Sequence, residues 1–299
     1  MHTETIQVLG SHRCELGESP LWHPQEQALY AVDIARRHIL RWRDGATEPE
    51  CWSVASEPSC LALRAQGGLV VARRDGLWSF DAATGRSECM QPPPFDPARQ
   101  RYNDGKVDAV GRLWVGTIDD ARRPDAHLYR LNPGGAQAMA AGITTSNGLA
   151  WSPDAQHLYW ADTKAHAIYR LPYDLATGAI GDRQVWAQFA ARDSSQPLKT
   201  YGGRPDGAAV DAEGAYWVAM FEGQRLLRLS PAGTVLAEIQ LPVRCPTMPC
   251  FGGADLRTLY ITTAREGRSA EELKSQPWAG ALLMLRVTVP GMPVVPARI

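Results

Sequence analysis

Four short segments of the sequence pair an oxygen-bearing side chain with glycine or proline. Glycine and proline favour tight turns, which can present a side chain to one side of the backbone. Carboxylate and amide oxygens together form the ligand set that hard divalent cations such as Ca²⁺, Mg²⁺ and Mn²⁺ prefer. The segments therefore indicate a cation site, although any one of them alone is also typical of a simple turn. They are Gly17-Glu18-Ser19-Pro20, Tyr102-Asn103-Asp104-Gly105, Ser146-Asn147-Gly148-Leu149 and Pro205-Asp206-Gly207-Ala208.

Several other chemistries have no support in the sequence. None of the seven histidines falls in these four segments, and there is no H-E-x-x-H motif, which disfavours a histidine-rich zinc site. The G-x-S-x-G elbow of serine hydrolases, the G-x-G-x-x-G dinucleotide loop and the Walker A phosphate loop are all missing. Metal-assisted chemistry is the reading that remains.

The elements that must position these segments are short β-rich runs that recur along the chain. Their starting positions differ by 40, 44, 45, 58 and 43 residues. Aromatic and β-branched residues dominate them, as expected for strands. A repeat of roughly 40–50 residues is typical of a propeller blade. The runs are 29–33, 69–73, 113–117, 158–162, 216–220 and 259–263.

Each run is flanked by a further strand-like run on either side, and no segment shows a convincing helical period. This pattern predicts an all-β fold, a six-bladed β-propeller, that occupies residues 1–299 as one domain. A two-sheet sandwich is the alternative, but it does not explain the period. The 58-residue step leaves room for an insertion at 191–203, and long polar insertions in repeat folds often act as lids.

The four segments fall at one level of the predicted repeat. Counting back from each β-rich run gives, in chain order, Glu18, Ser59, Asn103-Asp104, Asn147, Asp206 and, in the last repeat, the segment 250–253. The innermost strands of a propeller run in the same direction along a central channel. We therefore expect these side chains to converge at one mouth of that channel.

Composition limits the possible partners and location. The formal net charge is −1 and no basic run stands out, so neither nucleic acid nor an anionic membrane surface is an expected partner. No stretch is apolar enough for a signal peptide or a membrane span. Six scattered cysteines without a C-x-x-C pair predict reduced thiols and a cytoplasmic protein.

These motifs, in this order and over nearly the whole chain, resemble the gluconolactonase, regucalcin and senescence-marker-protein family. The segments that carry this resemblance are the four listed above, the stretch 101–108 and the Cys250-Phe-Gly-Gly253 segment. The resemblance implies a six-bladed propeller that hydrolyses a small-molecule sugar lactone. It also implies that Glu18, Asn147 and Asp206 hold one divalent cation, whether Ca²⁺, Zn²⁺, Mn²⁺, Mg²⁺ or Fe²⁺, and that Asp206 doubles as the general base.

The resemblance further implies that Arg101 and Asn103 contact the substrate. Relatives can present a Glu to the sugar after the Gly-Thr pair that matches Gly116-Thr117. Here Ile118-Asp119-Asp120-Ala121 follows, so such a contact would come from the shorter Asp120. Three alternatives to a sugar lactonase stay open: a phosphotriesterase-like hydrolase, a non-catalytic calcium-binding propeller, and a scaffold for protein partners.

Overall fold

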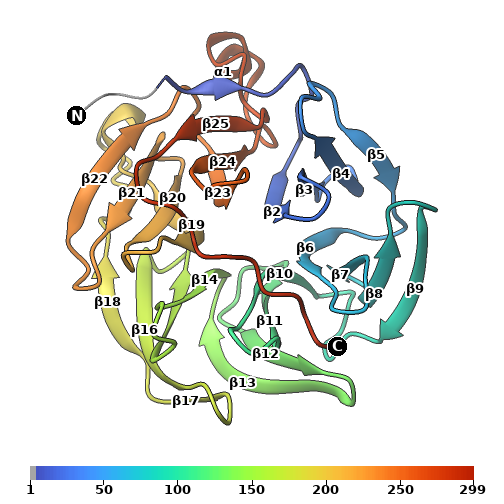
Figure 1. Cartoon of the computed structure of the whole chain (residues 1–299). Helices are drawn as coiled ribbons and strands as arrows, with labels where there is room; N and C mark the ends of the chain where they lie inside the picture. The colour runs from blue at the N-terminus through green and yellow to red at the C-terminus, as the bar shows by residue number, and fades with distance from the viewer. Residues whose placement is uncertain (1–4) are drawn as a thin grey trace.

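The structure is a computed structural model, and it describes residues 5–299. Six antiparallel sheets surround a central axis like the blades of a propeller (Figure 1). Each innermost strand contacts the innermost strands of both neighbouring blades, so the ring is closed. The predicted six-bladed β-propeller is confirmed. The innermost strands are β2 (Gly17–His23), β6 (Pro58–Leu63), β10 (Gln100–Val107), β14 (Ser146–Trp151), β19 (Arg204–Val210) and β23 (Pro246–Gly252).

The second strand of each blade coincides with one of the recurrent β-rich runs. These strands are buried on both faces because each blade packs between two others, so they read as continuous apolar runs instead of alternating ones. Six clusters of buried side chains fill the spaces between adjacent blades, for example Leu226 with Leu259 and Leu283. The second strands are β3 (Ala28–Asp33), β7 (Leu69–Arg73), β11 (Leu113–Asp119), β15 (His157–Asp162), β20 (Tyr216–Phe221) and β24 (Thr258–Thr263).

The two outer strands of each blade are more exposed, and β22 alternates between exposed and half-buried positions. The third strands are β4 (His38–Arg43), β8 (Gly76–Asp81), β12 (Ala126–Asn132), β16 (Ala167–Asp174), β21 (Arg225–Leu229) and β25 (Leu283–Arg286). The outermost strands are β5 (Glu50–Ser53), β9 (Arg86–Gln91), β13 (Gly135–Ile143), β18 (Gln184–Gln188), β22 (Val235–Gln240) and, in the last blade, β1 (Gln7–Val8).

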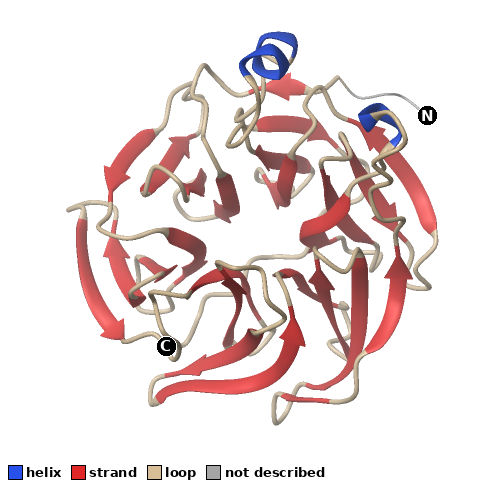
Figure 2. Ribbon diagram, turned by 180° about the vertical axis from the view of Figure 1, so that it is seen from behind, coloured by secondary structure: helices blue, strands red, loops and turns tan. Residues whose placement is uncertain are grey.

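Strand β1 closes the ring, a feature that the repeat pattern did not predict. Gln7 and Val8 pair with Met284 and Leu283 of β25, so the N-terminal segment completes the blade formed by the end of the chain (Figure 1). The pairing of β1 with β25 covers the outer edge of the last blade, which would otherwise be open to other chains. A short helix, α1 (Ala270–Ser275), lies in the loop between β24 and β25 at the periphery (Figure 2).

The long step between the fourth and fifth repeats has two contributions. An extra hairpin strand, β17 (Ala179–Ile180), pairs with the end of β16. The predicted insertion follows β18 and contains a single turn of 3-10 helix, η1 (Leu198–Thr200). Tyr201 is buried, and its hydroxyl lies 2.6 Å from Nε2 of His166 in the β15–β16 loop. The insertion is therefore attached to the loops at one end of the propeller.

The C-terminal tail crosses the opposite end of the ring (Figure 1). Ala297 hydrogen-bonds to the backbone at Leu63 and Ala65, and Arg298 donates to Gly111. A cavity of about 190 Å³ lies between the tail and the lower halves of the inner strands, with mainly apolar lining. Because the tail covers this end, access to the channel is expected from the end at which the inner strands begin.

Two further expectations concern the whole chain. All six cysteines are free, in agreement with the absence of a disulfide pattern. Within residues 5–299, no helix is long and apolar enough to cross a membrane. The cytoplasmic location remains a prediction.

Candidate active site

Every innermost strand is irregular at the same level, close to its N-terminal end. The pairing with the second strand shifts between Glu18 and Leu21, Pro58 and Cys60, Tyr102 and Gly105, Asn147 and Ala150, Pro205 and Ala208, and Pro246 and Met248. A β-bulge re-aims the side chains around it and is common beside active sites. The predicted level of the repeat is thus a ring of bulges at one mouth of the channel.

The four predicted segments lie at this ring. Asn103, Asp104 and Asp206 fall within bulges, whereas Glu18 and Asn147 immediately precede them. The glycines in these segments let neighbouring strands approach closely. A Cβ on Gly148, whose φ is +61°, would lie 2.3 Å from the Tyr216 hydroxyl, and one on Gly207 would lie 2.5 Å from Met248.

The prediction for the last blade was wrong. Its bulge contains Thr247, whereas Cys250 pairs with Tyr260 further along the strand and lines the cavity at the far end. Thr247 is fully buried and donates to the carbonyl of Gly17, 2.6 Å away. It therefore supports the backbone next to Glu18. The Phe-Gly-Gly motif led to a prediction at the wrong level of the strand, because the bulge at Thr247 carries no Asn, Asp or Gly.

Two buried aspartates fix the segments that lead into the site. Asp33, at the end of β3, accepts hydrogen bonds from the backbone of Glu15 and Leu16, shortly before Glu18. Asp162, at the equivalent end of β15, accepts from Thr144 and Thr145, shortly before Asn147. These aspartates act as anchors for the entry to the inner strands, so they are structural residues.

A chain of side-chain hydrogen bonds fixes the amides at the mouth. Arg101 donates from Nη1 to Oδ1 of Asn103, 2.7 Å away. Asn103 donates from Nδ2 to Oδ1 of Asn147 and to the carbonyl of Ser146, at 2.8 and 2.9 Å. Asn147 in turn donates from Nδ2 to Oγ1 of Thr163, 2.7 Å away. Since Nδ2 faces Thr163, Oδ1 of Asn147 faces the mouth and keeps a lone pair for a cation.

The same series of hydrogen bonds limits which atoms of Asn103 are available to a substrate. Its Nδ2 already donates twice, so only the second lone pair of Oδ1 is available. Asn103 is thus placed mainly to hold Arg101 and Asn147. Thr163 carries no motif in the sequence, and its role depends on a contact between the β14 and β15–β16 segments of one blade.

Three carboxylates at the mouth are close enough to perturb one another. Burial raises the pKa of Asp206 to about 8, and the negative charge of Asp104 adds to the shift. Burial also raises the pKa of Glu18 well above its usual value, with further contributions from Asp206 and Asp104. Asp104 itself is buried, which raises its pKa, and its Oδ1 makes no hydrogen bond within residues 5–299. A cation bound beside these buried carboxylates would stabilise their charged forms.

A divalent cation fits this donor set. Two carboxylates, Glu18 and Asp206, and the oriented amide oxygen of Asn147 supply hard oxygen donors. Within residues 5–299, this mouth included, no group of three or more His, Cys, Asp or Glu side chains is arranged to hold a metal ion. The donor set that fits a cation here therefore includes the amide oxygen of Asn147 as well as the two acids.

Arg101 is buried, and its side chain lies at the same mouth. Only its Nη1 makes hydrogen bonds within the described residues, to Asn103 and to the carbonyl of Tyr102. Nε and Nη2 remain available to a ligand. Burial lowers the pKa of Arg101 to about 10, so it stays charged at neutral pH.

Asp120, the third residue expected to contact the substrate after Arg101 and Asn103, lies in the loop after β11. Its carboxylate forms a two-point ion pair with Arg74, at 2.9 and 3.1 Å. A contact between Asp120 and a sugar would compete with this pair, and it stays a prediction.

Taken together, the closed ring of six blades and the oxygen-rich mouth define a class of propeller enzymes and binding proteins. The chain belongs to the SMP-30/gluconolactonase/LRE-like family, whose model matches residues 16–265.

Individual relatives match almost the full length. A 6-deoxy-6-sulfogluconolactonase from Pseudomonas putida is 46% identical over 292 residues, covering 96% of this chain and 97% of the relative. Regucalcin from Gallus gallus is 34% identical over 305 residues, covering 99% of each chain. Among solved structures, a calcium-binding protein, regucalcin, from Agrobacterium tumefaciens superposes with a TM-score of 0.91 at 27% identity, covering 99% of this chain and 98% of that one.

Proposed function

We propose that this protein is a metal-dependent hydrolase that opens a sugar lactone to the corresponding sugar acid. The observation that carries the proposal is the group of desolvated carboxylates, Glu18, Asp104 and Asp206, beside an oriented amide and an open guanidinium. Membership of a family that includes gluconolactonases supports the same reaction class. The relative that is 46% identical is named for a sulfonated gluconolactone, which makes a sulfonated lactone the first substrate to test.

The proposed cation ligands are Glu18, Asn147 and Asp206. When bound, a divalent cation would polarise the lactone carbonyl and lower the pKa of a nearby water molecule. In the reaction, the oxygen of water forms a bond to the lactone carbonyl carbon, and the ring C–O bond breaks. Asp206 accepts the proton of the attacking water and returns it to the departing ring oxygen, so that the product is the hydroxy acid.

The remaining residues orient the substrate. Nε and Nη2 of Arg101 have no partner within residues 5–299, so they can donate to substrate oxygens. Asn103 fixes Arg101 through Oδ1 and fixes Asn147 through Nδ2. Holding the lactone in one orientation contributes to the rate because the entropy of alignment is lost on binding.

A substrate panel with metal-loaded protein tests this proposal. We expect turnover of 1,4- or 1,5-aldonolactones and much weaker turnover of an organophosphate triester. Faster hydrolysis of the triester would instead favour a phosphotriesterase. Stoichiometric calcium binding without hydrolysis of any lactone would favour a calcium-binding role, the role for which the Agrobacterium tumefaciens regucalcin is named.

A further inference from the structure

Most arginines on one side of the mouth have carboxylate partners. Arg74, after β7, lies between Glu57, at 3.0 Å, and Asp120, at 2.9 Å. Arg123, after β11, pairs with Asp119 at 2.6 Å. These pairs largely cancel the charges that take part in them.

Arg101 and Arg122 are different, because neither forms an ion pair with a carboxylate within residues 5–299. Arg122 is exposed and its side chain makes no hydrogen bond to any described residue. Arg101 is 9% exposed, and its hydrogen bonds use Nη1 alone. Neither guanidinium is thus held in a close ion pair, although Glu18 and Glu57 lie near enough to Arg101 to favour its charged form.

The backbone brings these two arginines together. Arg101 pairs with Ile118, and Gln100 pairs with Asp119, in the ladder between β10 and β11. The chain then reverses direction after β11, where the backbone amide of Arg122 donates to the carbonyl of Asp119 at 2.9 Å. The positive charge of Arg122 acts on Arg101 and lowers the pKa of its guanidinium further, which indicates that the two groups are near each other. Like charges held together are unfavourable unless a ligand of opposite charge lies between them.

We propose that Arg101 and Arg122 form a subsite for an anionic substituent of the substrate, a sulfonate, phosphate or carboxylate group on the sugar lactone. A guanidinium binds such oxyanions through two parallel hydrogen bonds. Arg101 reaches the substrate from within the mouth, and Arg122 from its exposed rim. The anionic group therefore lies at the outer end of the substrate, away from the cation ligands. This inference rests on the proposed lactone hydrolysis.

The test compares three lactones that differ only at C6, with a hydroxyl, a phosphate or a sulfonate group. We expect the wild-type protein to prefer a charged lactone by at least about tenfold in kcat/KM. Arg122→Ala should reduce the ratio of charged to neutral kcat/KM by about tenfold, and Arg122→Lys should retain part of it. The preference should also weaken as salt concentration rises, because Arg122 is exposed. The comparison of the two charged substrates shows whether the subsite prefers a phosphate or a sulfonate group.

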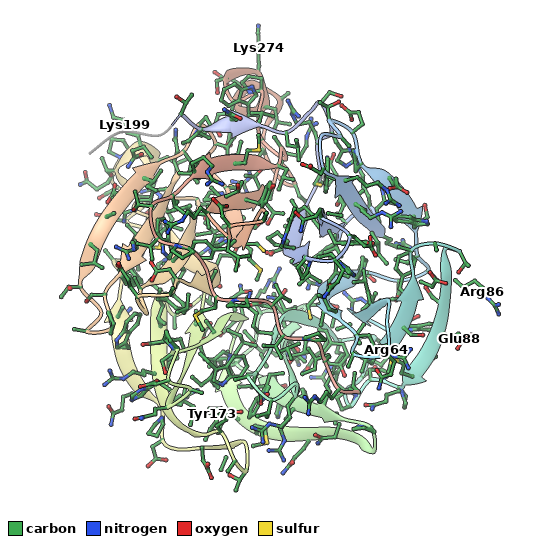
Figure 3. All side chains as sticks on the ribbon, in the orientation of Figure 1. Arg64, Arg86, Glu88, Tyr173, Lys199 and Lys274 are labelled. Carbon is green, nitrogen blue, oxygen red and sulfur yellow. The ribbon has the colours of Figure 1, made fainter. Side chains whose placement is uncertain are left out.

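A matched control is Arg86→Ala, on the outermost strand β9 at the rim of the molecule (Figure 3). It removes an arginine charge far from the mouth and should leave the ratio unchanged. An independent readout is equilibrium binding of 6-phosphogluconate, which should weaken in Arg122→Ala and not in Arg86→Ala.

The outcomes separate the two proposals. If wild type hydrolyses neither neutral nor charged lactones, lactone hydrolysis itself is wrong. The anion subsite is wrong, while lactone hydrolysis stands, in either of two cases. In the first, wild type hydrolyses the neutral lactone with the same kcat/KM as the charged ones. In the second, Arg122→Ala lowers all three activities equally.

Discussion

Asp206→Asn should lower kcat for lactone hydrolysis by at least about 100-fold at saturating metal, the effect expected for loss of a general base. The substitution keeps the shape of the side chain and one oxygen donor, but it removes the basic oxygen. Burial and the charge of Asp104 raise the pKa of Asp206 to about 8 in the chain without a cation. A bound cation lowers that pKa, so the carboxylate is ionised and able to accept a proton at neutral pH.

Metal binding must be measured alongside kcat, because Asp206 is also a proposed ligand. Residual binding should be detectable in Asp206→Asn, so that kcat can be determined with the site filled. A kcat within a few-fold of wild type would make Asp206 a ligand only. The base would then lie elsewhere, and Asp104, with its buried and unpartnered Oδ1, would be the next residue to replace.

The second large effect concerns stability. Without metal, the chain should lose stability as pH rises from about 4 to about 8. The folded-state pKa of Asp206 is raised to about 8, and those of Glu18 and Asp104 are also raised. The folded state therefore holds protons that the unfolded state has already released, and ionisation disfavours folding over this range. The rise from 3.8 to about 8 corresponds to at most about 6 kcal/mol for Asp206.

Thermal unfolding of metal-free protein between pH 5 and pH 8 measures this effect. The melting temperature should fall with pH, and added metal should raise it more at pH 8 than at pH 5. Asp206→Asn is the matched variant, since it removes one of the three titrating groups and should make the fall in melting temperature smaller. A wild-type melting temperature that does not fall with pH in metal-free protein would contradict the expected loss of stability.

The fold could be predicted from sequence because its strongest signal is local. A second strand lies between two neighbouring blades and carries a mostly apolar run, and one such run recurs in each blade. The resulting period identified all six second strands. Closure of the ring by β1 was not predictable in the same way, because two residues, Gln7 and Val8, carry no pattern that specifies pairing with β25.

The site was predictable to the extent that bulges leave a trace in the sequence. Glu18, Asp104, Asn147 and Asp206 stand next to Gly or Pro, and Asn103 directly precedes Asp104. The close approach of the inner strands requires glycine at Gly148 and Gly207. The bulge at Thr247 carries no Asn, Asp or Gly, and the prediction for that blade therefore missed it.

Contacts between different loops could not be read from the sequence. The bond from Asn147 to Thr163 and the pairing of Arg74 with Asp120 depend on which side chains meet in space. That Arg122 forms no ion pair with any carboxylate of residues 5–299 is likewise a property of the folded chain.

The central claim is that one divalent cation at the ring of bulges is required for hydrolysis of a sugar lactone. The most direct measurement is lactone turnover by chelated protein, first shown to be metal-free, during stepwise addition of Mn²⁺, Mg²⁺, Zn²⁺ or Ca²⁺. We expect background activity without metal and recovery that saturates at one equivalent per chain, with Glu18→Gln needing more metal for the same recovery. Full turnover by the metal-free protein would contradict it.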